Sequence, residues 1–372
     1  MKLLIGADLV PTSPVGDIPG GISERAFTHG DLEALFSDVL PLMRAADRVL
    51  VNLECALTDS DHAIPKIGPN LKASPACAAT LKRAGISDVA LANNHVFDYG
   101  IEGLKDTLSA LDSVGIPYMG VGMNDTDSRQ IYYIEENGVR VAVVNVCEHE
   151  YTYALSDRMG ANPFDPFLTM ADIRHAKKTA DFVVVLYHGG KENCRYPSPR
   201  LRNACREMVH NGADAVITQH SHCIGCYESY EGAHILYGQG NFHFALAGEN
   251  EMWNTGLLVE LEITDRMEMV FHPFEANGIT VSLAKGERYK ALMEELASRN
   301  EELQNGLWRQ RWTEFCHANR GIYDWAAENV GRDETEEARA AAVEHFAHYL
   351  DCEAHTDVWR ELYPTRNRTN EK

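Results

Sequence analysis

The sequence lacks a hydrophobic run long enough to cross a membrane, and it lacks the long apolar region of a secretion signal. Its first apolar stretch is short and is interrupted by Asp8. The nine cysteines are odd in number and scattered, so they lack the spacing of a disulfide framework. Free thiols of this kind suit a reducing compartment. We therefore expect a cytoplasmic protein without a membrane anchor.

Positive charge is also scarce. The 34 Lys and Arg stand against 55 Asp and Glu, so the formal net charge is −21. A field of this sign repels nucleic acid and anionic membranes and attracts divalent cations. We expect no nucleic-acid partner, although an acidic composition that serves only solubility would look the same.

Short apolar runs that end in polar residues recur along the first 220 of the 372 residues. Helical patterns lie between several of them; Leu104, Leu108 and Leu111, for example, fall on one helical face. This alternation predicts an α/β fold with buried, largely parallel strands. The expected strands cover residues 2–8, 48–54, 88–94, 140–147, 181–188 and 213–220.

The pattern changes twice further along the chain. Shorter strands follow from about residue 235, and we expect them to pair antiparallel and complete a second sheet. After about residue 285 the sequence becomes charged and helical, with helices expected at 294–307, 312–319 and 336–350. We predict a functional domain of residues 1–284 with a helical extension, 285–372, packed on it.

The polar residues at the strand ends are the informative feature, because ligands collect at the carboxyl ends of strands in open α/β sheets. Carboxylates, amides and imidazoles are the ligands of hydrolytic two-metal sites. One such residue alone is more often a cap or a structural group, so the prediction rests on their recurrence. His220 and His222, the last two residues of the series, would share one face of a regular strand. The series is Asp8, Asn52, Glu54, Asn93, Asn94, His95, His188, His220 and His222.

The order of these motifs resembles the CapA family, the capsule and poly-γ-glutamate synthesis proteins of the calcineurin-like metallophosphatase superfamily. The resemblance covers roughly residues 1–245 and implies a four-layer α/β/β/α sandwich of two mixed sheets. The motifs are Asp8, Asn52-Leu53-Glu54, Asn94-His95-x-x-Asp98-x-Gly100, His188-Gly189-x-x-Glu192, His220-x-His222 and Gly240-Asn241-Phe242.

The resemblance also implies two divalent metal ions, and manganese, iron and zinc all accept these ligands. Val10 stands where the superfamily has a histidine ligand, which removes one ligand from the first ion, and Gln219 stands where the family commonly has glycine. By the resemblance, the first ion takes Asp8 and His222, the second takes Asn94, His188 and His220, and Glu54 bridges them.

His95 matches the superfamily's general acid, and Asp98 is expected to orient its imidazole. The candidates for substrate binding come from residues beside the metal motifs. The lysine and arginine side chains among these candidates would suit a phosphate or carboxylate group of the substrate, although they could equally form surface ion pairs. These candidates are Asn52, Glu192, Lys191, Arg195, Arg25 and Asn241.

We predict hydrolysis of a phosphoester or related bond by a metal-activated hydroxide, on an anionic small-molecule or polymer substrate. The alternative is a non-hydrolytic accessory protein that binds a polyanion during capsule biosynthesis. Cys223-x-x-Cys226 resembles half of a zinc site or a redox pair. It lacks a second cysteine pair, and it does not open a helix after a strand, as a redox pair does.

Overall fold

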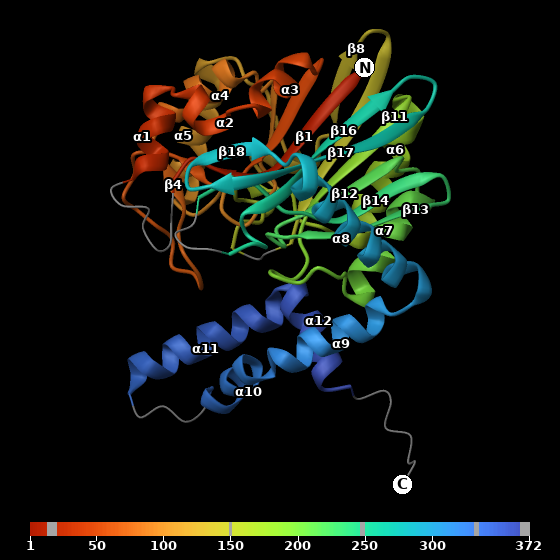
Figure 1. Cartoon of the computed structure of the whole chain (residues 1–372). Helices are drawn as coiled ribbons and strands as arrows, with labels where there is room; N and C mark the ends of the chain where they lie inside the picture. The colour runs from red at the N-terminus through yellow and green to blue at the C-terminus, as the bar shows by residue number, and fades with distance from the viewer. Residues whose placement is uncertain (13–20, 149–150, 246–249, 331–334, 365–372) are drawn as a thin grey trace.

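The computed structural model describes residues 1–12, 21–148, 151–245, 250–330 and 335–364. Two large β-sheets face each other, and helices cover their outer faces (Figure 1). The chain begins in a central strand of the first sheet, and the C-terminal helices lie together at one end of the sandwich.

The first sheet has the order β18-β17-β16-β1-β2-β5-β6, with β15 also paired to β1. Strands β1, β2, β5 and β6 are parallel, and β16, β17 and β18 add antiparallel neighbours beside β1. The bounds are β1 Lys2–Val10, β2 Arg48–Leu53, β5 Asp88–Ala90, β6 Tyr118–Met119, β15 Asn241–Phe244, β16 Thr255–Ile263, β17 Met267–Asn277 and β18 Thr280–Leu283.

The second sheet has the order β13-β14-β12-β11-β9-β8 and is parallel from β14 to β9. Two short ladders, β3 with β4 and β7 with β10, lie outside both sheets. The bounds are β8 Tyr132–Glu136, β9 Val139–Cys147, β11 Phe182–His188, β12 Ala215–Gln219, β13 Ile224–Tyr230, β14 Ala233–Gln239, β3 Ala56–Leu57, β4 Lys72–Ala73, β7 Val121–Gly122 and β10 Gly160–Ala161.

Helices cover the outer face of each sheet. In α6 and α7 a side-chain cap precedes a proline in the first turn, since Asp165 accepts from Phe167 N and Ser198 accepts from Leu201 N. The first sheet carries α1 Ile22–His29, α2 Leu32–Phe36, α3 Val39–Ala45, α4 Cys77–Ala84 and α5 Gly100–Ser113, and the second carries α6 Pro166–Thr179 and α7 Pro199–His210; a short 3-10 helix covers Asp127–Arg129.

Strand alternation creates the layers. Ile5 of β1 and Leu186 of β11 are buried together between the two sheets, whereas their neighbours Leu4 and Val185 face the outer helices. Both sheets are thus apolar on both faces, as sheets enclosed by helices must be. The expected four-layer α/β/β/α sandwich of two mixed sheets is confirmed.

One topological expectation was wrong. Strands β16, β17 and β18 do not complete the second sheet, because they extend the first one next to β1. Of the strands expected from about residue 235, β14 does belong to the second sheet, where it pairs antiparallel with β13. Local sequence pattern identifies a strand but not its partner, which depends on long-range packing.

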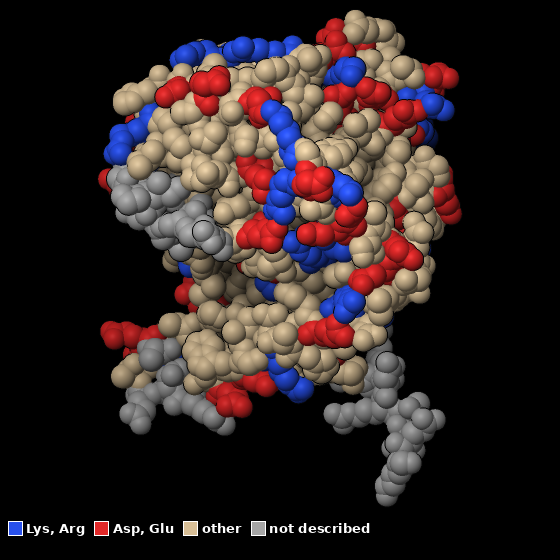
Figure 2. Space-filling view, in the orientation of Figure 1, with Lys and Arg blue, Asp and Glu red and all other residues tan. Residues whose placement is uncertain are grey.

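Within the described part of the chain, five helices follow residue 285, and two of them, α10 and α12, were not expected from the sequence. Helix α8 runs along the sandwich, and α9 to α12 form a group at its end (Figure 1). Acidic and basic side chains are interspersed on the face shown in Figure 2. The bounds are α8 Gly286–Asn305, α9 Trp308–Ala318, α10 Arg320–Asn329, α11 Glu336–Asp351 and α12 Glu353–Leu362.

Among the described helices, none is both long enough and apolar enough to cross a membrane.

Candidate metal centre

The carboxyl ends of strands from both sheets meet at one edge of the sandwich. Asp8 lies near the end of β1 and is paired in register with Asn52 of β2, and Glu54 directly follows β2. From the second sheet, His188 is the last residue of β11, paired with Gln219 at the end of β12. Parallel strands thus place oxygen ligands from one sheet opposite imidazoles from the other.

The distances show how tightly these groups are assembled. His188 Nε2 lies 2.8 Å from Asn94 Oδ1 and 3.2 Å from Glu54 Oε1. On the other side, His222 Nδ1 lies 3.5 Å from Asp8 Oδ2. His188, Glu54 and Asp8 are fully buried, so water does not screen the electrostatic interactions between them.

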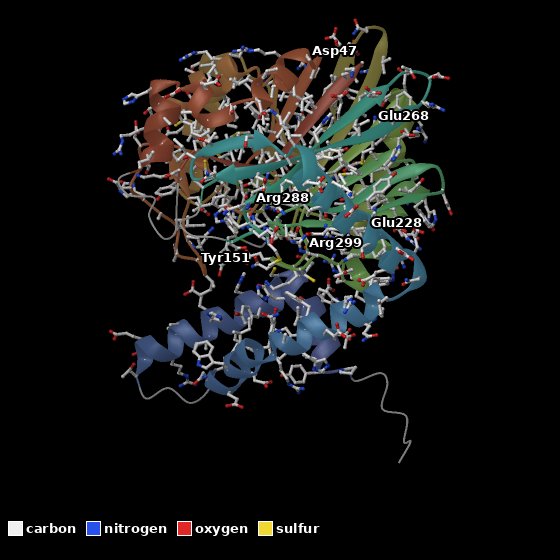
Figure 3. All side chains as sticks on the ribbon, viewed as in Figure 1. Asp47, Tyr151, Glu228, Glu268, Arg288 and Arg299 are labelled. Atoms are coloured by element: carbon white, nitrogen blue, oxygen red, sulfur yellow. The ribbon has the colours of Figure 1, made fainter. Side chains whose placement is uncertain are left out.

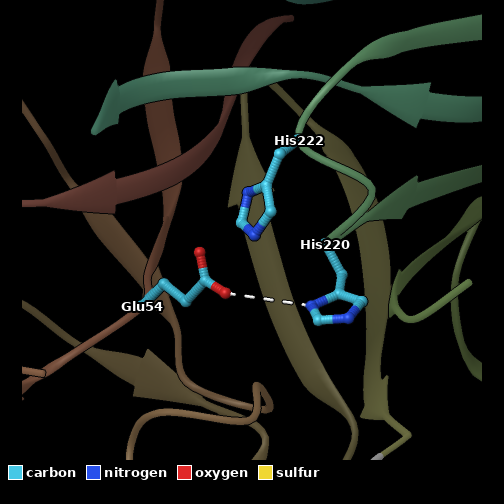
Figure 4. Close-up of side chains that lie close together, drawn as sticks. All are labelled: Glu54, His220 and His222. Carbon is cyan, nitrogen blue, oxygen red and sulfur yellow. Dashed lines mark ion pairs between the residues drawn. The ribbon is translucent and has the colours of Figure 1, made fainter. Parts of the chain in front are cut away.

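Glu54 faces His220 and His222 (Figure 4). It belongs both to a group with His220 and His222 and to a group with Asp8 and His188, and each group could hold a metal ion. Neither carboxylate oxygen of this buried side chain has a hydrogen-bond partner among the described residues. An unsatisfied buried carboxylate is costly, and a bound cation would satisfy it.

The electrostatics of the cluster point the same way. Burial, and then repulsion by Asp8, raise the pKa of Glu54 well above its usual value. Burial opposes the charge of His222, but its hydrogen bond with Asp8 and the nearby Glu54 raise its pKa to about 9. Burial lowers the pKa of His188 to about 4. Carboxylates this close need positive charge between them, so the donor set fits divalent cations.

His220 and His222 reach the site by a different route from the one expected. Strand β12 ends at Gln219, and both histidines follow it with left-handed backbones, at φ 84° and φ 53°. Alternation along a regular strand therefore does not place them on one face. Such backbones cost on the order of 1–3 kcal/mol and concentrate at functional sites. One stabilising contact is the hydrogen bond from His220 N to Asp8 Oδ2, 3.1 Å long.

Two amides orient the ligands. Asn52 donates to Asp8 Oδ1 at 2.8 Å and lies 3.2 Å from His188 Nδ1, so it bridges the two sheets. Asn241 Oδ1 lies 2.8 Å from His222 Nδ1. Both were candidates for substrate contact, and the structure places them against metal-ligand candidates instead.

His95 lies beside the cluster with Asp98, as the motif predicts. Its Nδ1 is 2.7 Å from Asp98 Oδ2, so the carboxylate holds the proton on this nitrogen. The ammonium of Lys66 contacts Asp98 and lies 3.1 Å from His95 Nδ1. Burial, and then Lys66, lower the pKa of His95 to about 4. The resting imidazole is therefore neutral, with Nε2 as its proton acceptor.

Sequence reasoning missed Lys66 because it lies in a loop, residues 58–71, without a recognisable motif. It also missed how Glu148 acts. This buried side chain accepts from Gly190 N at 2.9 Å and from Arg200 Nη2 at 2.5 Å, so it fixes the turn that follows His188. His149 and Glu150, which follow Glu148 in the sequence, lie outside the described residues.

The remaining candidates separate into two pairs. Glu192 and Lys191 border the site, and Glu192 Oε1 lies 3.9 Å from His220 Nε2. Arg195 instead donates to Ile224 O at 3.2 Å, and Arg25 is exposed on α1.

The two departures from the superfamily pattern are both buried. Val10 is fully buried in the outer core of the first sheet, and Gln219 donates to Gln239. Cys223 and Cys226 are buried free thiols, like the other seven cysteines, and neither belongs to a candidate metal group among the described residues.

A cavity of about 300 Å³ opens onto the cluster. Asn94, His95 and His220 line its inner end, next to Lys191 and Glu192. A substrate in this cavity would therefore reach the imidazole of His95 and the candidate metal ligands together.

Comparison with solved structures gives distant matches. One is a 5'-nucleotidase precursor from Thermus thermophilus, with a TM-score of 0.43 and 15% identity, covering 82% of this chain and 59% of that one. A likeness with a TM-score below 0.5 says nothing about function.

Sequence relatives are closer. The PGA biosynthesis protein CapA of Bacillus subtilis (strain 168) is 32% identical over 242 residues, 64% of each chain. The capsule biosynthesis protein CapA of Bacillus anthracis is 33% identical over 241 residues, 62% of this chain and 58% of that protein. The chain thus spans less than two thirds of the length of these relatives, and the resemblance to the CapA family is confirmed.

The family model described as bacterial capsule synthesis protein PGA_cap matches residues 13–245. The match includes every candidate metal ligand except Asp8, which precedes it, and it ends before the C-terminal helices. Since it covers more than half of the chain, the protein belongs to the bacterial capsule synthesis protein PGA_cap family.

Proposed function

We propose that the protein is a metal-dependent hydrolase with two divalent ions that cleaves a phosphoester or related bond in capsule or poly-γ-glutamate metabolism. The observation that carries this proposal is Glu54, a fully buried carboxylate without a hydrogen-bond partner among the described residues, shared by two ligand groups. A structural carboxylate would be satisfied by protein donors. A carboxylate that bridges two ions needs none.

The residues are divided between two ions as the family resemblance implies, and two contacts support this division: His222 Nδ1 lies 3.5 Å from Asp8 Oδ2, and His188 Nε2 lies 2.8 Å from Asn94 Oδ1. Asp8 and His222 would hold one ion, with Val10 offering no further donor on β1. Glu54 would be shared, and the ligands of the second ion would be Asn94, His188 and His220. Bound divalent ions supply Lewis-acid polarisation of a substrate oxygen and a water-derived nucleophile at neutral pH.

His95 would move a proton at Nε2, because Asp98 occupies Nδ1. The resting ring is neutral, so it must gain a proton before it protonates a leaving oxygen. An anionic substrate group close to the ring favours the charged imidazolium. Asn52 and Asn241 would keep His188 and His222 in place while this happens.

The test is the metal content of the purified full chain by mass spectrometry, followed by a screen of phosphodiester substrates. We expect about two equivalents of a transition metal per chain and a clear fall in His220→Ala. His234→Ala is the control, because this half-buried histidine of β14 contacts Tyr227 and Met267 outside the site. Unchanged metal content in His220→Ala, or no metal after soaking with manganese, would contradict the proposal.

A second function is supported by the relatives' names, PGA biosynthesis protein CapA and capsule biosynthesis protein CapA. In this alternative the protein binds a polyanion during biosynthesis and hydrolyses nothing. Full metal content without turnover of any phosphodiester or peptide-like substrate would favour it. Turnover that is lost in His95→Gln would favour the hydrolase.

A further inference from the structure

The cavity over the candidate metal centre is closed by the part of the chain that the family model does not cover. Of the fifteen lining residues that the structure describes, six belong to the C-terminal helices or to the turn between α11 and α12. Helices α11 and α12, with the turn between them, supply most of this wall. These six residues are Ile322, His348, Tyr349, Cys352, Ala354 and His355.

The described lining of the cavity has few carboxylates for so acidic a protein. The chain carries a net charge of −21, yet the lining residues that the structure describes include two lysines, four histidines and a single carboxylate, Glu192. Lys66 pairs with Asp98, so Lys191, which stands beside Glu192, is the other lysine of the lining. Lysine and imidazole donors gathered in one cavity of an acidic protein indicate an anionic ligand.

The two histidines of the helical wall are held in defined positions. His355 stacks on Tyr349 with ring centroids 4.2 Å apart, and its Nδ1 lies 2.8 Å from Tyr323 OH. Burial lowers the pKa of His355 to about 2, so this neutral ring offers a hydrogen bond and not a charge. His348 stacks on Tyr151, with centroids 5.7 Å apart, and Figure 3 shows Tyr151 where the sandwich meets the C-terminal helices. Preorganised side chains of this kind lower the entropic cost of binding.

Buried hydrogen bonds and ion pairs connect the same helices to the residues around the candidate metal centre. Asp357 of α12 accepts from Ser198 Oγ at 2.6 Å and from Arg200 Nε at 2.9 Å. Arg200 in turn contacts Glu148, which accepts from Gly190 N beside His188. A continuous chain of contacts therefore runs from α12 to the turn behind a candidate metal ligand.

Residues 191–200 run from the turn after His188 into the start of α7, and they contact both the cavity and the C-terminal helices. Lys191 lines the cavity, and Cys194 packs in the apolar cluster of the C-terminal helices together with Trp312 and Tyr323. The position of Lys191 thus depends on the docking of these helices.

We propose that the C-terminal helices complete a binding site for an anionic group of the substrate, a phosphate or a carboxylate, held by Lys191, His348 and His355. A cavity of about 300 Å³ lies at the lower end of ligand pockets, so it takes a small molecule or the end of a polymer. The helices thereby select which anions reach the metal centre. The role of this site in a reaction rests on the proposed function, whereas anion binding by the site does not.

The test measures anion binding by calorimetry on the full, manganese-loaded chain, with inorganic phosphate and glutarate as separate probes. We expect the double variant Lys191→Met/His348→Gln to raise the Kd of the preferred probe at least about tenfold, with metal content unchanged. The preferred probe distinguishes a phosphate site from a carboxylate site. The matched control is Lys290→Met/His175→Gln, because both residues are exposed on helices outside the cavity.

Equal affinity of wild type and double variant for both probes, or no binding of either probe by wild type, would overturn the inference. Circular dichroism and thermal melting show whether the double variant folds, and the single variant Lys191→Met is titrated in its place if it does not. The proposed function fails separately, if the wild type holds no metal or hydrolyses nothing. In that case the anion titrations still decide whether the helical wall binds an anion.

Discussion

The two-sheet body and the C-terminal helices bury different kinds of side chain. The body has extended clusters of Leu, Ile and Val on both faces of its sheets. Helices α9 to α12 share one small cluster, dominated by aromatic rings and joined to the body through Cys194. Paired strands hold their ends in register through long-range backbone hydrogen bonds, whereas the helices depend on side-chain packing and a few polar links.

This difference suits the two regions to different tasks. Every candidate metal ligand lies in a strand of the body or in the loop that follows one, where a rigid backbone favours a fixed coordination geometry. The helices lie over the cavity, where their side chains influence what enters. Variants of the body should therefore change metal content and turnover, and variants of the helices should change binding and stability with the metal retained.

The largest expected effect is that of Glu54→Gln. Because Glu54 belongs to both ligand groups, we expect metal content to fall below half and hydrolysis to fall to background. Without metal, the variant should melt at a higher temperature than metal-free wild type, since a neutral amide removes repulsion from Asp8. Mass spectrometry and calorimetry check both results, with the exposed Glu268→Gln as control. Full metal content in Glu54→Gln would remove the basis of the dinuclear site.

His95→Gln should separate chemistry from metal binding within the body. We expect kcat to fall about 10²–10⁴-fold, the usual contribution of acid–base catalysis, while metal content stays at the wild-type level. Lys66→Met should keep most of this activity, because Asp98 still orients the ring. Steady-state kinetics on the substrate found by the screen measure both variants. A metal loss in His95→Gln would show that this residue is a ligand.

Asp357→Ala tests the link between the two regions. Removing one partner of a buried ion pair costs about 3 kcal/mol at the low end, because Arg200 keeps its contact with Glu148. Four of the five tryptophans follow residue 285, so urea unfolding followed by fluorescence reports on the helices and circular dichroism on the whole chain. The control is Arg309→Ala, which breaks the more exposed pair with Glu361 and should cost less than about 1 kcal/mol. Equal losses in the two variants would contradict a special role for Asp357.

The smallest expected effect concerns pH and Glu353 of α12. Burial, and then the nearby Glu148, raise its pKa from 4.5 to about 7. The folded protein therefore holds a proton that the unfolded chain releases, and this contribution to stability is lost as pH rises from about 4.5 through 7. Glu353→Gln should remove this dependence and stabilise the protein at pH 8 by on the order of 1 kcal/mol. Urea unfolding at pH 5 and pH 8 measures it, with the exposed Glu337→Gln as control; a wild-type pH dependence in the variant would contradict the assignment.

Much of the body was predictable because its strands are local features. The six expected parallel-type strands all exist, with ends that differ by a few residues, and their apolar runs and polar ends are visible without a structure. The pairing of β16 to β18 with β1 was not predictable, since strands with the same pattern fit either sheet. Helices α10 and α12 were missed although each is amphipathic, because each has only 10 residues and buries its apolar face by packing against α9 and α11.

The sequence by itself determined which residue types stand at the strand ends, because strand formation and ligand chemistry both depend on local residues. Only the tertiary structure decided how they meet. It left the oxygens of Glu54 without donors among the described residues, turned His220 and His222 inward through left-handed backbones, and brought Lys66 to Asp98. It also closed the cavity with helices more than a hundred residues away along the chain. The physical reason is that burial, repulsion and cavity shape arise between segments distant in sequence, and no local pattern encodes them.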